Sequence, residues 1–180
     1  VTLDNTYGAA SGSPATGYIT SSNASSLASA LRGVDVGAAI NAATGITLKG
    51  ASIAGYYSVD LTAAITSSAG SIVISGAGSN YSVHSTATGT INATLGSVTI
   101  NGTSTTGKSV ELLGLVTAKT GITIAGDASG SAPTNVSLGA MTINAGGGNI
   151  VVTANDVSLG ANTGIYQAGA ITNKAVGSSI

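Results

Sequence analysis

Three short apolar motifs recur in a fixed order along this chain, and segments rich in glycine and hydroxyl residues separate them. Alternation of apolar and polar residues over about three to five positions is typical of strands and not of helices. A repeat of about 24 to 28 residues lies within the range of stacked repeat architectures. Together these observations predict an all-β fold, a right-handed parallel β-helix (β-solenoid) of about six coils.

Each motif consists of an apolar residue, any residue and usually a second apolar residue, which fits a short strand with one face buried. The first motif begins at Ile46, Ile72, Val98, Ile122 and Ile150. The second motif covers Val34-Asp35-Val36, Val59-Asp60-Leu61, Val83-His84-Ser85, Val110-Glu111-Leu112, Val136-Ser137-Leu138 and Val157-Ser158-Leu159. The third, weaker motif surrounds Ile40, Ile65, Ile91, Val116, Ile143 and Ile171.

The segments between the motifs supply turns, as in Gly76-Ala77-Gly78-Ser79-Asn80. One such coil cannot bury its inner face, so coils must stack, with each strand pairing with its equivalent about 4.8 Å away. An antiparallel sandwich is the alternative, but it needs tight hairpins, and Asn101-Gly102 is the only Asn-Gly or Asp-Gly dipeptide here. The fixed order of three motifs favours the β-helix.

The beginning of the chain departs from this repeat. Residues 22–33 start with polar capping candidates, place Leu27 and Leu31 four positions apart and end on Gly33, which predicts one short helical excursion. We therefore divide the chain into a leading coil or linker (1–17), a strand plus short helical insert (18–33) and β-helix repeats (34–180).

Composition excludes several classes of function. The net charge of -1 and the scarcity of Lys and Arg argue against nucleic acid or anionic membranes as partners. The chain has no cysteine, so it contains neither disulfides nor a thiolate metal site. No apolar run has the length of about 20 residues needed to insert in a membrane, and the start at Val1 suggests a piece of a longer protein.

Titratable residues are too sparse to indicate an enzyme or a cofactor site, since His84 is the sole candidate general base. They do form one column: Asp35, Asp60, His84 and Glu111 are the middle residues of four successive second motifs. Stacked about 4.8 Å apart, they are a candidate cation site or pH-sensitive strip. The alternative, which we favour, is a solvated outer face with compensated charges.

Other surface patterns carry weaker hypotheses. The column Thr47, Val73, Thr99, Thr123 and Val151 is interrupted too often for an ice-binding array, and β-branched residues are common on sheet surfaces. Tyr57 and Tyr81 precede equivalent strands and are candidates for stacking between coils, and packing at a corner is favoured over a carbohydrate-binding platform. Gly126-Asp127 lacks the repetition of a calcium-binding roll. Glycosylation sequons begin at Asn23, Asn80, Asn92, Asn101 and Asn135, a number that chance also explains.

The motifs in Gly45-Ile-Thr-Leu-Lys-Gly50, Gly96-Ser-Val-Thr-Ile-Asn-Gly102, Gly121-Ile-Thr-Ile-Ala-Gly126 and Gly148-Asn-Ile-Val-Val-Thr-Ala-Asn155 resemble the shaft repeats of filamentous-haemagglutinin-like, two-partner-secreted bacterial adhesins. The resemblance extends from about Tyr18 onward, and 18–36 is similar to a helical insert of that family. The Asn-Pro-Asn motif of the family's secretion domain is missing. The resemblance implies a secreted, cell-surface rod that holds a binding part away from the cell.

Three functions follow as hypotheses. The first is a structural shaft of a secreted surface adhesin, with an unidentified receptor or glycan on a host or neighbouring cell as partner. The second is an extracellular filament or surface-layer subunit that associates end to end with further copies. The third, remote, is a carbohydrate-active β-helix enzyme that uses the acidic column.

Overall fold

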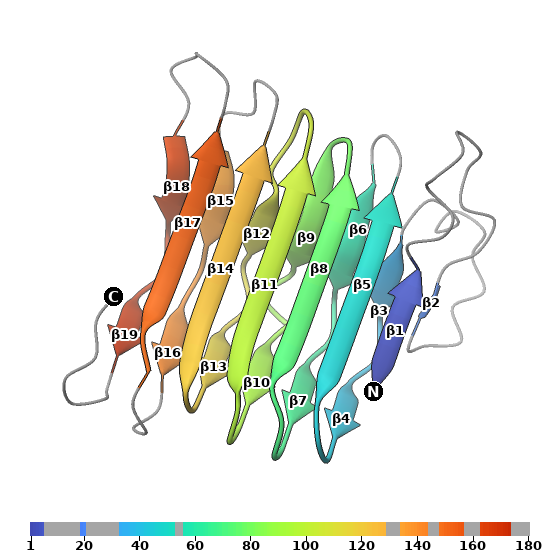
Figure 1. The fold of residues 1–180 in the computed structure, drawn as a ribbon, viewed down its shortest axis with the longest axis vertical. Coiled ribbons are helices and arrows are strands. Elements are labelled where there is room, and N and C mark those ends of the chain that lie inside the picture. The colour runs from blue at the N-terminus through green and yellow to red at the C-terminus, as the bar shows by residue number, and fades with distance from the viewer. Residues whose placement is uncertain are drawn as a thin grey trace.

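Stacked coils of short parallel strands form a β-solenoid in this protein (Figure 1). The computed structural model describes residues 1–5, 19–20, 33–52, 56–128, 134–143, 148–156 and 163–173. The prediction of an all-β fold built from parallel stacked coils is confirmed. Within these described residues, no helix has the length and apolar character needed to span a membrane.

Each coil adds one strand to each of three parallel sheets. Sheet A, whose long strands face the viewer in Figure 1, contains β1 (Thr2–Asn5), β5 (Ile46–Ser52), β8 (Ile72–Gly78), β11 (Ser97–Ser104), β14 (Gly121–Ala128) and β17 (Ile150–Asp156). Sheet B contains β2 (Ile19–Thr20), β3 (Val34–Val36), β6 (Tyr57–Leu61), β9 (Tyr81–Ser85), β12 (Val110–Leu112), β15 (Thr134–Leu138) and β18 (Thr163–Gln167). Sheet C contains β4 (Ile40–Ala42), β7 (Ile65–Ser67), β10 (Ile91–Ala93), β13 (Val116–Ala118), β16 (Met141–Ile143) and β19 (Ile171–Asn173).

The chain visits the sheets in the order B, C, A and then begins the next coil. In Figure 1 the front strands of sheet A run upward, the chain passes behind them at the top, and successive coils follow from right to left, which is a right-handed path. About four turns, from β3 to β14, are described with a gap only at 53–55. The predicted number of six coils is not confirmed, and the predicted helical insert falls on 21–32, outside the described residues.

Strand pairing confirms the register of the first motif, because Ile46, Ile72, Val98, Ile122 and Ile150 are paired in this order across sheet A. The leading segment already belongs to the solenoid, since β1 pairs in parallel with β5.

Two assignments near the end of the chain were wrong. The partner of Val136 in sheet B is Ile165, so β18 and not 157–159 continues that sheet. In sheet C the equivalent of Val116 is Met141, two residues before the predicted Ile143. The first error arises because β17 and β18 lie farther apart in the sequence than the equivalent strands of earlier coils, and the second because the connection from β15 to β16 is shorter than that from β12 to β13. Neither shift can be read from short apolar motifs alone.

The core is a set of apolar ladders that run along the solenoid axis. Their side chains come from all three sheets, and a residue in one coil packs on its equivalent in the next. The largest fully buried side chains are Ile46, Leu48, Leu61, Ile65, Ile72, Ile74, Ile91, Ile100, Leu112, Ile122, Ile124 and Leu138. A single coil cannot bury these side chains by itself, because each needs the equivalent residue of a neighbouring coil as a contact. The coils therefore fold together as a stack.

Sheets A and B approach each other most closely at the corner where a strand of sheet A leads into sheet B. The paired glycines of sheet A lie there, and a Cβ on Gly102 would overlap the backbone carbonyl oxygen of Ser109. Gly50 and Gly76 in the same column also meet backbone atoms of sheet B, whereas a Cβ on Gly126 would overlap side-chain atoms there. At these four positions a side chain would force the two sheets apart, whereas the equivalent positions in the outermost strands β1 and β17 hold Asn5 and Ala154.

Buried hydroxyl and amide groups fill the same corner on the sheet B side. Ser58 Oγ donates to the carbonyl oxygen of Ala77 at 2.7 Å, and Ser109 Oγ donates to that of Asn135 at 3.0 Å. Asn135 Nδ2 donates to the carbonyl oxygen of Asn155 at 2.8 Å. These bonds satisfy polar groups that are almost completely buried, and they join neighbouring coils.

We expect Gly102→Ala to lower the free energy of unfolding by about 1 to 3 kcal/mol, because the new methyl group displaces the Ser109 carbonyl. The matched control is Gly121→Ala, whose Cβ would lie 3.4 Å from the nearest atom, an ordinary contact. Denaturant unfolding followed by circular dichroism measures both changes. Equal stability of the two variants would contradict the close approach of sheets A and B.

Candidate functional site

The predicted column of charged residues is present on the outer side of sheet B. Asp35 pairs with Asp60, Asp60 with His84 and His84 with Glu111 in successive coils. Their strand neighbours, such as Val59 and Leu61, are buried in the core. The register that sequence periodicity predicted for these four residues is therefore confirmed.

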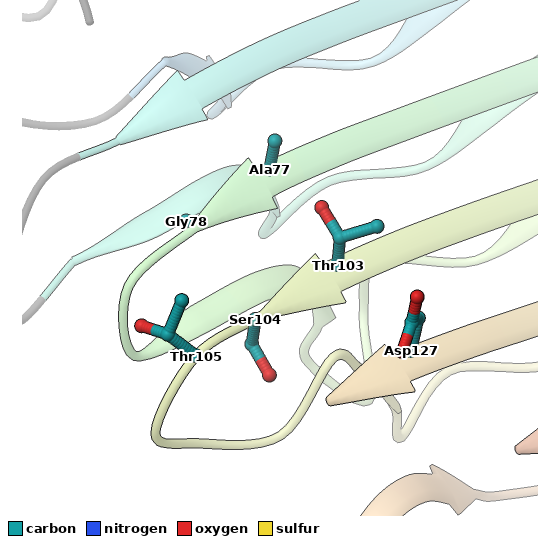
Figure 2. Close-up of a pocket in the computed structure, with 6 residues that line it drawn as sticks. All are labelled: Ala77, Gly78, Thr103, Ser104, Thr105 and Asp127. Atoms are coloured by element: carbon teal, nitrogen blue, oxygen red, sulfur yellow. The ribbon is translucent and has the colours of Figure 1, made fainter. Parts of the chain in front are cut away.

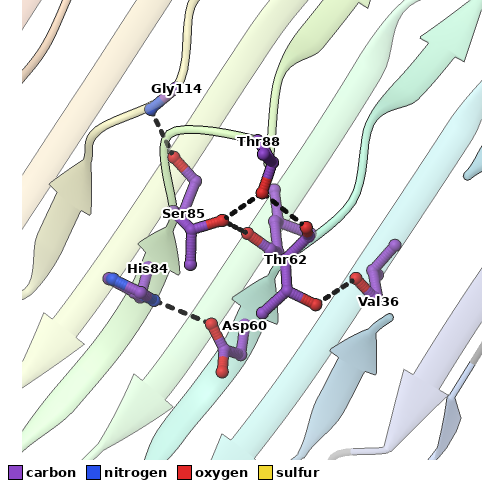
Figure 3. A network of polar contacts seen from close by, with 9 residues as sticks. Val36, Asp60, Thr62, His84, Ser85, Thr88 and Gly114 are labelled. Atoms are coloured by element: carbon purple, nitrogen blue, oxygen red, sulfur yellow. Dashed lines mark hydrogen bonds and ion pairs between the residues drawn. The ribbon is translucent and has the colours of Figure 1, made fainter. Parts of the chain in front are cut away.

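Asp60 and His84 form the closest contact of this column. The Asp60 Oδ1 atom lies 2.7 Å from His84 Nδ1, and the two side chains are only 4% and 12% exposed (Figure 3). Parallel pairing of β6 with β9 places them opposite each other, so the contact follows from the backbone register. It links two coils on the outside of the sheet, where most polar groups would face water.

Two tyrosine rings accompany the Asp60–His84 pair. The rings of Tyr57 and His84 are stacked, with centroids 4.2 Å apart and planes inclined by 14°. The rings of Tyr57 and Tyr81 lie 5.0 Å apart and are tilted by 46°. The two tyrosine rings therefore contact each other between coils, but they are tilted and not stacked. We name the set Tyr57, Asp60, Tyr81 and His84 the aromatic clasp.

Sequence reasoning missed the contact between Tyr57 and His84 because it assumed strict alternation along β6. In the structure Ser58 and Val59 are both buried, the first at the corner and the second in the core ladder. This local break in alternation lets Tyr57 meet His84, an outer residue three positions beyond Tyr81 on β9. The repeated Tyr-Ser-Val sequence at 57–59 and 81–83 is the signal that could have revealed it.

The rest of the column has other contacts. Lys108 Nζ forms an ion pair with Glu111 Oε1, and these side chains are 31% and 17% exposed. Within the described residues, no group of three or more His, Asp or Glu side chains is arranged to hold a metal ion. The column that was a candidate cation site thus contains the hydrogen-bonded Asp60–His84 pair and the Lys108–Glu111 ion pair, with Asp35 half-buried at one end.

Hydroxyl groups around the clasp are used by the corners of the coils (Figure 3). Thr62 Oγ1 donates to the Val36 carbonyl at 3.2 Å and Thr88 Oγ1 donates to the Thr62 carbonyl at 2.9 Å. Ser85 is buried and its Oγ accepts a hydrogen bond from the Gly114 N–H at 3.3 Å. These hydroxyls form hydrogen bonds between neighbouring coils, so their role in this arrangement is structural.

A shallow hollow of about 310 Å³ lies where strands of sheet A end (Figure 2). Figure 2 shows that it is formed by three neighbouring coils, and its only charged lining residue is the exposed Asp127. The other lining residues are Ala77, Gly78, Thr103, Ser104 and Thr105. The sequence contains no signal for this hollow, because the same small residue types occur at every corner.

The asparagines of the predicted sequons differ in their exposure to solvent. Asn101 is exposed on β11, whereas Asn80 and Asn92 are half-buried, and Asn23 lies outside the described residues. Asn135 is fully buried, donates to the Gly126 and Asn155 carbonyls and accepts from Ser109 Oγ. A glycan on Asn135 is incompatible with this fold, and Asn101 is the most accessible acceptor among the four described sequons.

We expect Asp60→Asn and His84→Phe to be coupled in a double-mutant cycle of unfolding free energy, with an interaction energy of about 1 to 3 kcal/mol. Phenylalanine preserves an aromatic ring beside Tyr57 but leaves the buried carboxylate without its imidazole partner. Glu111→Gln is the control, and we expect it to cost less than about 1 kcal/mol because its pair with Lys108 is more exposed. Additive effects at Asp60 and His84 would rule out a stabilising contact.

No protein-family model, no curated protein and no solved structure was found to match this chain. The fold and the clasp are therefore interpreted from their own geometry.

Proposed function

We propose that this chain is a structural shaft segment of a large secreted bacterial surface adhesin, which extends a binding part away from the cell and contributes to attachment. The observation that carries the proposal is the unbroken in-register stacking of sheet A from β1 to β17. A stack of this kind becomes longer by about 4.8 Å with each added coil, so it forms an elongated rod that can span a distance from the cell.

Three further features support a stiff shaft. The buried apolar residues form one core cluster that continues from coil to coil. Corner hydroxyls add bonds between coils, as when Thr105 Oγ1 and Thr106 Oγ1 donate to the Ser79 carbonyl at 2.7 and 2.8 Å. The surface owes its solubility to hydroxyl and amide groups, because only 6% of the residues are charged.

The resemblance to filamentous-haemagglutinin-like shafts leads us to place the protein outside the cell, at the bacterial surface. Its partner in this proposal is a receptor or glycan on another cell, recognised by a part of the protein beyond the repeats. The number of about six coils and the helical insert within 18–33 belong to the same proposal.

A filament or surface-layer subunit is the second candidate, and one observation favours it. In the described part of the chain, β17, β18 and β19 each pair on one side only. Ile165 and Tyr166 of β18 are 42% and 54% exposed beside this edge. An open edge with apolar side chains is a surface on which another copy of the chain could add strands.

Electron microscopy of the purified chain over a wide range of concentrations tests the two candidates. We expect short rods whose length does not change with concentration, because the length of a shaft is set within one molecule and not by association of copies. Filaments that lengthen with concentration would instead support the subunit, and compact helical particles would contradict both.

Deletion of residues 83–109 tests the modular stack directly. It removes one coil and joins Ser82 to Val110, so that the Tyr-Ser-Val sequence and the pairing of equivalent strands are restored. We expect a folded protein whose long dimension, measured by small-angle scattering, is shorter by about 4.8 Å. Deletion of residues 83–110 is the out-of-register control: it joins Ser82 to Glu111 and shifts β12 by one residue, which would bring outer side chains into the core, and we expect it to unfold.

A further inference from the structure

Tyr57 and Tyr81 occupy equivalent positions on neighbouring coils and are paired across the β6–β9 ladder. Their ring centroids are 5.0 Å apart, and the planes are tilted by 46°. At this separation the two rings are in contact, and their tilt is intermediate between a stacked and an edge-to-face arrangement. Both side chains are half-buried, so they are restrained by their surroundings and still reach the surface.

The backbone holds this pair in place. The β6–β9 ladder also pairs Val59 with Val83 in the core, and the Asp60–His84 contact closes the outer side. Tyr57 is further confined by the His84 ring, which stacks on it at 4.2 Å. The two phenol rings therefore stay in contact as long as the two coils remain stacked.

We propose that Tyr57 and Tyr81 are a site of oxidative coupling, at which a dityrosine bond covalently joins two coils. The chain has no cysteine, so a disulfide cannot supply such a bond. The class of co-reactant is a one-electron oxidant, such as a haem peroxidase with hydrogen peroxide. The site needs no metal or cofactor of its own.

The reaction balances with one equivalent of hydrogen peroxide. Each phenol loses one electron and its hydroxyl proton and becomes a phenoxyl radical. The two radicals form a carbon–carbon bond between positions ortho to the oxygens, and the two ortho hydrogens shift to the oxygens as protons and restore both phenols. Two electrons and two protons leave in total, and they reduce hydrogen peroxide to two molecules of water.

Proximity makes this pair selective among the six tyrosines of the chain. Tyr57 and Tyr81 belong to neighbouring coils and their rings are in direct contact. Tyr166 is 54% exposed on β18 and reports coupling between separate molecules instead. Two groups held in contact react at an effective concentration far above that of dilute protein. The bond would close the coil between residues 57 and 81 and so constrain the unfolded chain.

The test exposes the folded full chain, at low concentration, to horseradish peroxidase and limiting hydrogen peroxide. We expect a monomer lighter by two hydrogen atoms, with dityrosine fluorescence and a crosslinked peptide that contains Tyr57 and Tyr81. The crosslinked monomer should unfold at a higher temperature than the untreated chain.

Tyr81→Phe keeps an aromatic ring at the position but removes the phenol, and we expect it to lower the yield of fluorescent monomer at least about tenfold. The matched control Tyr166→Phe should leave that yield unchanged and reduce only crosslinked dimers. Circular dichroism establishes that both variants are folded.

Several outcomes would overturn the proposal. These are an undiminished yield in folded Tyr81→Phe, a crosslink that maps to Tyr57 and His84, or fluorescence confined to dimers. Absence of any crosslink in the wild-type chain would do the same, provided that free tyrosine couples under identical conditions. None of these outcomes bears on the shaft function, which the microscopy tests separately.

Discussion

In-register parallel hydrogen bonding between equivalent strands is the constraint on which the rest of this structure depends. It places each residue about 4.8 Å from its own equivalent in the next coil, so every choice of side chain is repeated along an axis. Isoleucine on isoleucine, glycine on glycine and threonine on threonine follow from this single rule. The same rule brings Asp60 to His84 and Tyr57 to Tyr81.

The corner between sheets A and B shows how tightly the cross-section is specified. The glycine column of sheet A lets the backbone of sheet B approach until no Cβ fits, and buried hydroxyls bond the carbonyls that this approach leaves in the interior. Apolar ladders stabilise the broad part of the core, whereas small residues and hydrogen bonds define the narrow part. The coil therefore has one shape that each repeat must reproduce.

The aromatic clasp is an exception in an otherwise uniform surface. Most outer positions carry threonine, serine or asparagine, and the clasp gathers two tyrosines, a histidine and an almost buried aspartate across one coil boundary. Its side-chain contacts join two coils on the outer side of sheet B, where the apolar core residues make no contact. Oxidative coupling would make the same fastening covalent, in a chain that has no cysteine to do so.

The sequence alone determined the fold class, the order of the three strands in each coil and the register of the Asp35-to-Glu111 column, because a repeat of period-two motifs allows few other structures. It did not reveal the stacking of Tyr57 on His84, the hollow at Asp127 or the place of β18 in sheet B. Those were decided by tertiary structure: buried Ser58 and Ser82 break the alternation, three neighbouring coils form the hollow, and a longer connection after β17 shifts β18. Periodicity specifies which residues face inward, but only packing in space specifies which neighbours the outer residues meet.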